Sequence, residues 1–181
     1  VAYAKANPGK LNYGSAGMGS PHRLTTEYFA SRAGVSLLHV PFKGQGPVVP
    51  EIVAGRVDMA FLAISSVIQF MPTGKVRAIA IAGAQRSAIA PELPTLAEAG
   101  LPGANVDWWL GVLAPTGTPP DIVQKLNAEI VALCKQPEFR ARLAAQGIDA
   151  IGSTPEAFAA VLRDEIPRWT QVVKTAGIKQ Q

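Results

Sequence analysis

The sequence predicts an α/β fold built around a mostly parallel β-sheet, and three observations support this prediction. Segments typical of strands and of helices alternate from residue 11 to residue 113, as they do when helices connect parallel strands. Two glycine-rich loops, at residues 14–20 and 43–46, each join an expected strand to an expected helix. The chain has 181 residues, of which 48% are hydrophobic, so it is long enough to form a substantial core.

The first strand is expected at residues 11–13 and is followed by a helix at 21–33. Ser20 suits the N-cap of this helix, Pro21 its first turn and Gly34 its C-terminal end. The elements expected next are a strand at 35–42, a helix at 48–54, a strand at 57–63, a short helix at 65–71 and a strand at 76–82.

The second half of the chain is mainly helical. The expected elements are a short helix at 95–99, a long strand at 105–113, helices at 120–135 and 138–145, a short strand at 148–151 and a final helix at 155–175, which Pro167 should kink. The apolar faces of the helices after residue 113 need a sheet to cover. That sheet is either the one formed by residues 11–113 or one that this sequence does not contain.

Composition and charge exclude several other classes of protein. High hydrophobicity and a net charge of only +4 argue against intrinsic disorder. No apolar heptad persists, which excludes a coiled coil, and the longest apolar run, at residues 59–64, is too short to span a membrane. The 17 Lys and Arg residues are spread along the chain, so we expect no nucleic-acid partner despite a pI near 9.4. The positive excess fits small anionic ligands equally well.

The loop at residues 14–20 is the first candidate for a ligand site. Small residues let the backbone approach a ligand closely, and ligands of α/β sheets bind beyond the carboxyl ends of strands. Free N–H groups at the start of the next helix attract an anion such as a carboxylate. The order of the glycines matches neither the dinucleotide fingerprint nor a P-loop. A merely structural tight turn is the alternative.

Two more loops follow expected strands. For residues 43–46, a simple turn with a solvated Lys43 is at least as good an interpretation as a ligand site. For residues 63–66, capping of a short helix by Ser65 and Ser66 is the simpler interpretation.

Residues suited to catalysis or metal binding are few. Ser15 or Ser20 could be combined with His22 and Asp58, but no spacing supports such a triad and no nucleophile elbow occurs. His39 lies in an apolar segment and is predicted to be a core residue with a hydrogen-bond partner. One cysteine and two distant histidines give no metal-binding pattern, and we expect no cofactor.

The cysteine and two tryptophans are best interpreted as packing residues. Cys134 lies in a helical apolar pattern, which favours a buried structural thiol over a nucleophile. Trp108 and Trp109 would point to opposite faces of the expected strand, so one of them at most would line a pocket.

Several motifs occur in order along the whole chain. The first is NPGKLNYGSAG at residues 7–17, followed by GSP at 19–21. The others are HVPFKG at 39–44, GRVD at 55–58, GKVRAIA at 74–80, LPTLAEAG at 93–100, APTGTP at 114–119, LNAE at 126–129 and TPE at 154–156. Together these motifs resemble the Bug family, the TctC-like solute-binding receptors of tripartite tricarboxylate transporters.

The resemblance implies a type II periplasmic binding protein fold, in which two α/β lobes close on a ligand like a clamshell. Residues 10–107 would form the complete second lobe. Residues 1–9 would be the end of the first lobe or the crossing segment, and residues 108–181 the C-terminal part of the first lobe. The sequence begins VAYAK, which is no signal peptide and which enters in mid-helix, so we expect a chain whose N-terminal portion is absent.

Ligands of this family are mostly small carboxylates, and the resemblance assigns ligand binding to two loops. The residues assigned are Ser15, Ala16, Gly17, Gly19, Ser20, Ala63, Ile64 and Ser65. The sequence departs from the family pattern at Met18, at the order His22-Arg23, and at Leu62 and Ala63, where relatives often have polar residues. These departures favour a more apolar or aromatic acid.

The function implied is a periplasmic, non-enzymatic, monomeric receptor that delivers a small organic acid to the membrane subunits of a transporter. It would not itself be embedded in the membrane. A cytoplasmic ligand-sensing domain of a transcription regulator is the first alternative, and an upstream DNA-binding module would distinguish it. An enzyme is the second alternative and would need a paired base and nucleophile near residues 14–20.

Overall fold

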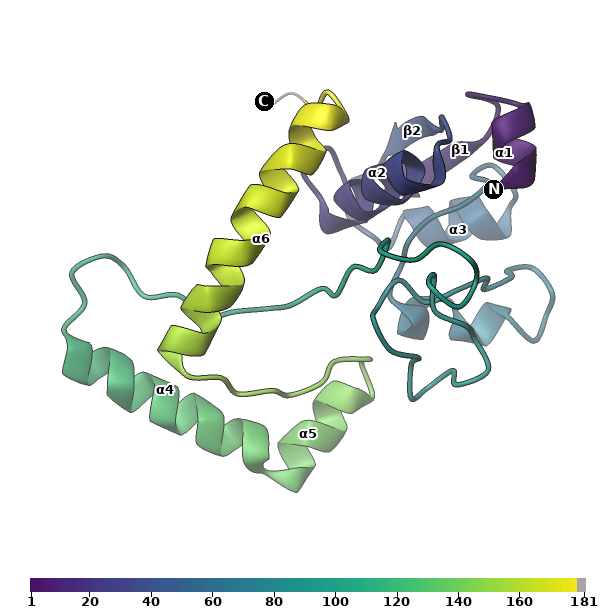
Figure 1. The fold of residues 1–181 in the computed structure, drawn as a ribbon. Helices are drawn as coiled ribbons and strands as arrows, with labels where there is room; N and C mark the ends of the chain where they lie inside the picture. Colours follow the sequence, from purple (N-terminus) through teal and green to yellow (C-terminus); the bar gives the residue numbers. More distant parts are fainter. Residues whose placement is uncertain (179–181) are drawn as a thin grey trace. The chain divides into compact units, whose positions relative to one another are not determined.

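The computed structural model describes residues 1–178, and they form two compact units (Figure 1). The first unit contains Val1–Trp108 together with the segment that starts at Trp169. The second unit is Trp109–Arg168. The division into lobes that the resemblance implied stays a prediction.

The first unit is built on two parallel strands. Its elements are α1 (Ala2–Ala6), β1 (Asn12–Ser15), α2 (Pro21–Ala33), β2 (Leu38–Pro41), α3 (Val48–Val53) and the short 3₁₀ helices η1 (Ile64–Ser66) and η2 (Ile68–Phe70). Asn12 lies opposite Leu38 and Ser15 opposite Pro41, so both strands end at the same edge. Helix α2 has the predicted bounds, because Ser20 caps its start and Gly34 ends it in a left-handed conformation.

The core of the first unit lies around β1. Tyr13 and Val48 are fully buried, and Val57 is nearly so. Gly14 makes this packing possible, since a Cβ at this position would lie 2.6 Å from Cγ1 of Val48 and 3.3 Å from Cγ1 of Val57. The missing side chain therefore lets α3 pack directly on the strand.

Three of the expected strands are not regular strands. Residues 57–63 make a single bridge, Met59 to Tyr13, and residues 76–82 a single bridge, Ile81 to Thr95. The carbonyl that Ile81 pairs with belongs to Pro94, which has no N–H to extend a ladder. In residues 105–113, Val106 N donates to Ala82 O, and the chain enters the second unit at Trp109. In the part of the chain that the structure describes, these segments therefore form no regular ladder.

Three other elements are also shorter or less regular than the sequence predicted. The second strand covers only Leu38–Pro41 of the expected 35–42. Residues 65–71 form the two 3₁₀ turns instead of one helix. Residues 95–99 form a turn, in which Thr95 N donates to Glu98 and Glu98 N donates to the Thr95 hydroxyl. That reciprocal pair is a capping box, but no regular helix follows it.

The second unit is helical. It contains α4 (Pro120–Lys135), α5 (Pro137–Ala144) and the residues of α6 (Pro155–Thr175) up to Arg168; α6 continues through Pro167. Within the described part of this unit no strand forms at 148–151, because Ala150 O accepts from the Arg140 guanidinium instead of from a neighbouring strand.

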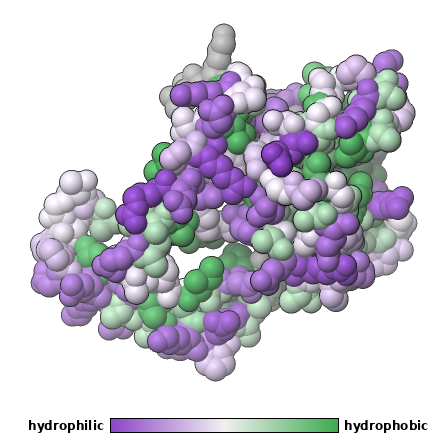
Figure 2. Space-filling model, in the orientation of Figure 1, coloured by the Kyte–Doolittle hydropathy of each residue, from purple (hydrophilic) through white to green (hydrophobic). Residues whose placement is uncertain are grey.

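The apolar residues of the second unit are largely exposed. Leu126 in α4 is 52% exposed and Leu110 is 87% exposed. Figure 2 shows such apolar residues in green among polar ones on the face in view. The described residues therefore leave the apolar face of α4 only partly covered. No helix in the described range is both long and apolar enough to cross a membrane.

Candidate ligand-binding site

Three loops meet beyond the carboxyl ends of β1 and β2. Gly44 N donates to Ala16 O at 3.2 Å and joins the loop after β2 to the loop after β1. Ala63 N donates to Oε1 of Gln45 at 3.3 Å and joins the third loop to the second. The two strands are parallel, so this edge is the usual position of a ligand site in an α/β sheet.

Ser15 is buried and its hydroxyl is fully used within the protein. Its Oγ lies 2.6 Å from Nε2 of His39, accepts from Gly17 N at 3.2 Å and donates to Gly17 O at 3.1 Å. These contacts use the one hydrogen and both lone pairs of the hydroxyl. Ser15 therefore shapes the loop, and its hydroxyl has no remaining capacity for a ligand.

Ser20 fixes the other end of the same loop. Its Oγ donates to Gly17 O at 2.8 Å and accepts from Arg23 N at 3.4 Å, which makes it the N-cap of α2. Gly17 has a φ of +128°, a conformation that side-chain-bearing residues rarely adopt. The loop is thus held in one conformation by residues at both of its ends.

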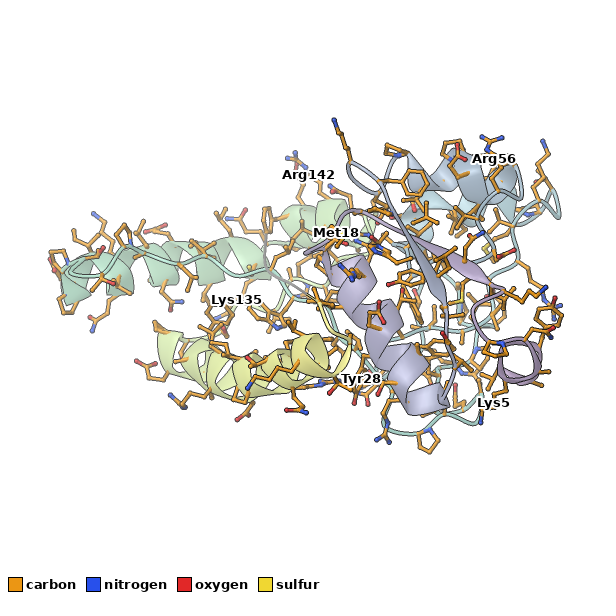
Figure 3. The ribbon with its side chains drawn as sticks, turned by 90° about the horizontal axis from the view of Figure 1, so that it is seen from above. Lys5, Met18, Tyr28, Arg56, Lys135 and Arg142 are labelled. Atoms are coloured by element: carbon orange, nitrogen blue, oxygen red, sulfur yellow. The ribbon has the colours of Figure 1, made fainter. Side chains whose placement is uncertain are left out.

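Between these two anchors the loop presents unused backbone donors. Within the described chain the N–H groups of Ala16, Met18 and Gly19 make no hydrogen bond. Met18 and Gly19 are exposed (Figure 3 labels Met18 near the N-terminal end of α2). Unpaired N–H groups beside a helix N-terminus favour an anion.

Charged groups lie directly behind this loop. The Arg23 side chain is 10% exposed, and its Nη1 donates to Met18 O at 3.2 Å and contacts Met18 Sδ at 3.3 Å. Its Nε lies 3.8 Å from a carboxylate oxygen of Glu27, which also accepts from the Tyr13 hydroxyl at 2.6 Å. Burial raises the pKa of Tyr13 well above its usual range, and the Glu27 carboxylate raises it further. Much of the Arg23 charge is therefore balanced by Glu27.

His39 is half-buried and has the partner that the sequence predicted it to need, although it does not lie in the core. Its ring stacks on Tyr13 with centroids 4.9 Å apart. Burial lowers its pKa from 6.5 to about 4, and the positive charge of Arg23 adds to this effect. His39 is therefore neutral near pH 7.

Sequence reasoning missed Gln45 at this site and interpreted Trp108, which also lies here, as a packing residue. Gln45 Oε1 lies 2.8 Å from Nε2 of His22, in the first turn of α2. The rings of Trp108 and His22 pack in a T-shaped arrangement with centroids 4.7 Å apart, and Trp108 Nε1 donates to the Thr25 hydroxyl at 2.8 Å. Gln45 lies in the loop at residues 43–46, which the sequence analysis had already considered as a ligand site. Its place in that loop was the one signal that could have pointed to it.

The side chains expected of a hydrolase do not assemble. Asp58 accepts from Asn12 N at 2.8 Å, and His22 pairs with Gln45, so the serines of the loop have neither an acid nor His22 as a partner. No group of three or more metal-binding side chains occurs among the described residues. Trp109 packs on Phe158 in the second unit, with ring centroids 5.1 Å apart, and does not lie in a strand.

The family profile described as the tripartite tricarboxylate transporter family receptor, TctC, matches residues 1–178. The chain belongs to this family. A curated TctC relative from a Pseudomonas species, the UPF0065 protein in the tcbD-tcbE intergenic region, is 43% identical over 94% of this chain and 51% of its own length. Protein BugT of Bordetella pertussis is 35% identical over 99% of this chain and 55% of its own length. The chain thus spans about half the length of these relatives.

Solved structures agree with this TctC assignment. An R. palustris protein determined with adipate has a TM-score of 0.85 and 35% identity, over 98% of this chain and 59% of that one. The periplasmic binding protein BugD has a TM-score of 0.82 and 32% identity, over 99% of this chain and 61% of that one. MatC of Rhodopseudomonas palustris, with bound malate, has a TM-score of 0.79 and 36% identity, over 95% of this chain and 60% of that one. The chain therefore has the fold of part of a periplasmic binding protein.

Proposed function

We propose that this protein is a periplasmic receptor that captures a small carboxylate and delivers it to a tripartite tricarboxylate-type transporter. The observation that carries the proposal is the set of unpaired N–H groups of Ala16, Met18 and Gly19 at the start of α2. A hydrogen bond to a charged oxygen contributes about 1.5–3 kcal/mol, so a few such bonds with apolar contacts reach the roughly 8 kcal/mol of a micromolar complex.

The assigned residues have different roles in this proposal. Ala16, Gly17 and Gly19 are small, so a ligand could approach the backbone of the loop closely at these residues. Ser15 and Ser20 hold the loop in its conformation. Residues of the third loop, Ala63, Ile64 and Ser65, would contact the ligand beside the first loop, at the same edge of the sheet. Met18 and Ala63 are apolar, which favours a ligand with an apolar chain or ring. The adipate and malate named with two structural relatives are carboxylates of the proposed class.

The proposed role requires binding without turnover. The serines of the loop are committed to loop contacts, and His39 has only Ser15 and Tyr13 as its partners in the described residues. We therefore expect the protein to return its ligand chemically unchanged.

The direct test is a thermal-shift screen of the natural full-length protein against aliphatic dicarboxylates, hydroxy acids, aromatic acids, amino acids and nucleotides. A ligand at 100 times its Kd stabilises the folded state by about 2.7 kcal/mol, which gives a readable rise in Tm. We expect rises with carboxylates. A response to nucleotides, with none to carboxylates, would contradict the proposal.

The position of the site is tested by introducing a negative charge into the loop at residues 14–20. A Cβ at Gly19 meets nothing within 4 Å and its backbone is not left-handed, so both Gly19→Ala and Gly19→Asp should fold. We expect the Asp variant to lose at least tenfold in carboxylate affinity through like-charge repulsion. The Ala variant is the matched control and should bind within about threefold of the natural protein. Equal titration curves for the two variants would exclude this loop as the anion site.

A further inference from the structure

Gln45 is the side chain at which the parts of the candidate site are joined. Its Oε1 lies 2.8 Å from Nε2 of His22 in α2 and 3.3 Å from the backbone nitrogen of Ala63 in the third loop. The residue before it, Gly44, donates from its N–H to Ala16 O in the first loop. One amide side chain therefore lies among all three loops.

The hydrogen-bond partners decide which way the amide faces. The backbone N–H of Ala63 is only a donor, so the atom of Gln45 that it contacts must be the carbonyl oxygen. The same oxygen faces Nε2 of His22, which must then carry the hydrogen of that bond. The His22 ring is held in turn by its edge contact with Trp108. Both acceptor contacts hold the amide in a single orientation.

The amide nitrogen of Gln45 is left with two unused hydrogens. Among the described residues it makes no hydrogen bond, and it is not one of the fully buried polar atoms that lack a partner. Gln45 as a whole is half-buried. An oriented donor that keeps some access to solvent costs little conformational entropy when it binds an acceptor.

We propose that Gln45 is a ligand-contacting residue that donates from its amide nitrogen to an oxygen of the bound carboxylate. This inference rests on the proposed function and adds a side-chain donor to the backbone donors of residues 16–19. An amide N–H₂ group favours acceptor groups, such as carboxylate, carbonyl or hydroxyl oxygens, over ammonium groups. Gln45 would therefore favour acids without a positive charge over amino acids.

The test is Gln45→Glu, which retains the oxygen acceptor and replaces the donor by a charged acceptor. The bonds from His22 and Ala63 are retained, so Tm without ligand should stay within about 2 °C of the natural protein. The Kd for the best carboxylate of the screen should rise at least tenfold, about 1.4 kcal/mol. Gln85→Glu makes the same change at an exposed residue and should leave Kd within twofold.

The outcomes separate this inference from the proposed function. If the natural protein binds carboxylates and Gln45→Glu binds them equally well, Gln45 is no ligand contact, while the receptor role stands. If the natural protein binds no carboxylate, the receptor role itself fails. A measurement without substitution adds to this test: the side-chain amide NMR signals of Gln45 should shift on carboxylate addition while those of Gln85 stay fixed. Unchanged Gln45 signals at saturation would overturn the inference.

Discussion

The hydroxyl of Ser20 performs two structural tasks at once. It caps α2 through Arg23 N and closes the glycine-rich loop through Gly17 O. We expect Ser20→Ala to lower the free energy of unfolding by about 1 kcal/mol, as the loss of an N-cap usually does, and to weaken carboxylate binding because the loop loses one anchor. Urea unfolding and ligand titration measure the two effects. Ser31→Ala, on the exposed side of the same helix, is the control, and an equal effect of both changes would contradict this role.

We expect His39 to make the stability of the folded protein depend on pH. Burial, and to a smaller extent the charge of Arg23, lowers its pKa from 6.5 to about 4 in the folded state. Between pH 6.5 and about 4 the unfolded chain binds a proton at this residue that the folded chain does not. The free energy of unfolding therefore has its full value, as far as His39 is concerned, above pH 6.5 and decreases as the pH falls to about 4. We expect the free energy of unfolding of the His39→Gln variant to fall less than that of the natural protein when the pH is lowered over this range. Parallel unfolding curves at pH 7.5, 5.5 and 4.5 measure this, and identical pH dependences would show that His39 does not titrate as described.

At the scale of residues, the sequence predicted what depends on local spacing. Ser20, Pro21 and Gly34 are a cap, a first-turn proline and a C-terminal glycine that act on their own helix, so their roles follow from their positions along the chain. The role of Gln45 depends on His22 and Ala63, which are 23 and 18 residues away. No local pattern specifies such a meeting, which is why the sequence did not single out Gln45.

At the scale of elements, the packing of α3 on β1 depends on the absence of a side chain at Gly14. A methyl group there would lie 2.6 Å from Val48 and force β1 and α3 apart. We expect Gly14→Ala to cost about 1–3 kcal/mol of stability, the usual range for overpacking. Gly46→Ala is the matched control, since its Cβ meets nothing within 4 Å. Chemical denaturation of both variants tests this, and an equally stable Gly14→Ala protein would contradict the packing argument.

The helices agreed with the sequence far better than the strands did. Helix α4 has its predicted bounds, because its hydrogen bonds close within the segment and its apolar spacing is a local property. A strand needs a partner with successive free groups, and the apolar run at 76–82 finds one bridge, from Ile81 to Thr95. Strand-like composition therefore predicted more sheet than these segments form, since each needs a partner elsewhere in the chain.

At the scale of the whole molecule, the chain spans about half the length of its TctC relatives, and its candidate site is formed by the three loops beyond β1 and β2. Backbone donors near α2, the amide of Gln45 and the apolar residues of the third loop would contact one side of a carboxylate. A ligand shifts a receptor between open and closed conformations only when it contacts the closed one better. Binding from one side alone would therefore leave the conformation of the natural full-length protein unchanged.

We expect instead that the natural full-length protein becomes more compact when a carboxylate binds, because hinge closure around a ligand lets both sides of the site contribute to its affinity. Small-angle X-ray scattering should show a smaller radius of gyration at saturating ligand. The Gly19→Asp variant at the same ligand concentration is the control, since it should fold normally and remain expanded. An unchanged radius in a protein shown by titration to be saturated would mean that the loops of this chain bind the ligand without closure, and that Gln45 and the N–H groups before α2 supply most of the affinity.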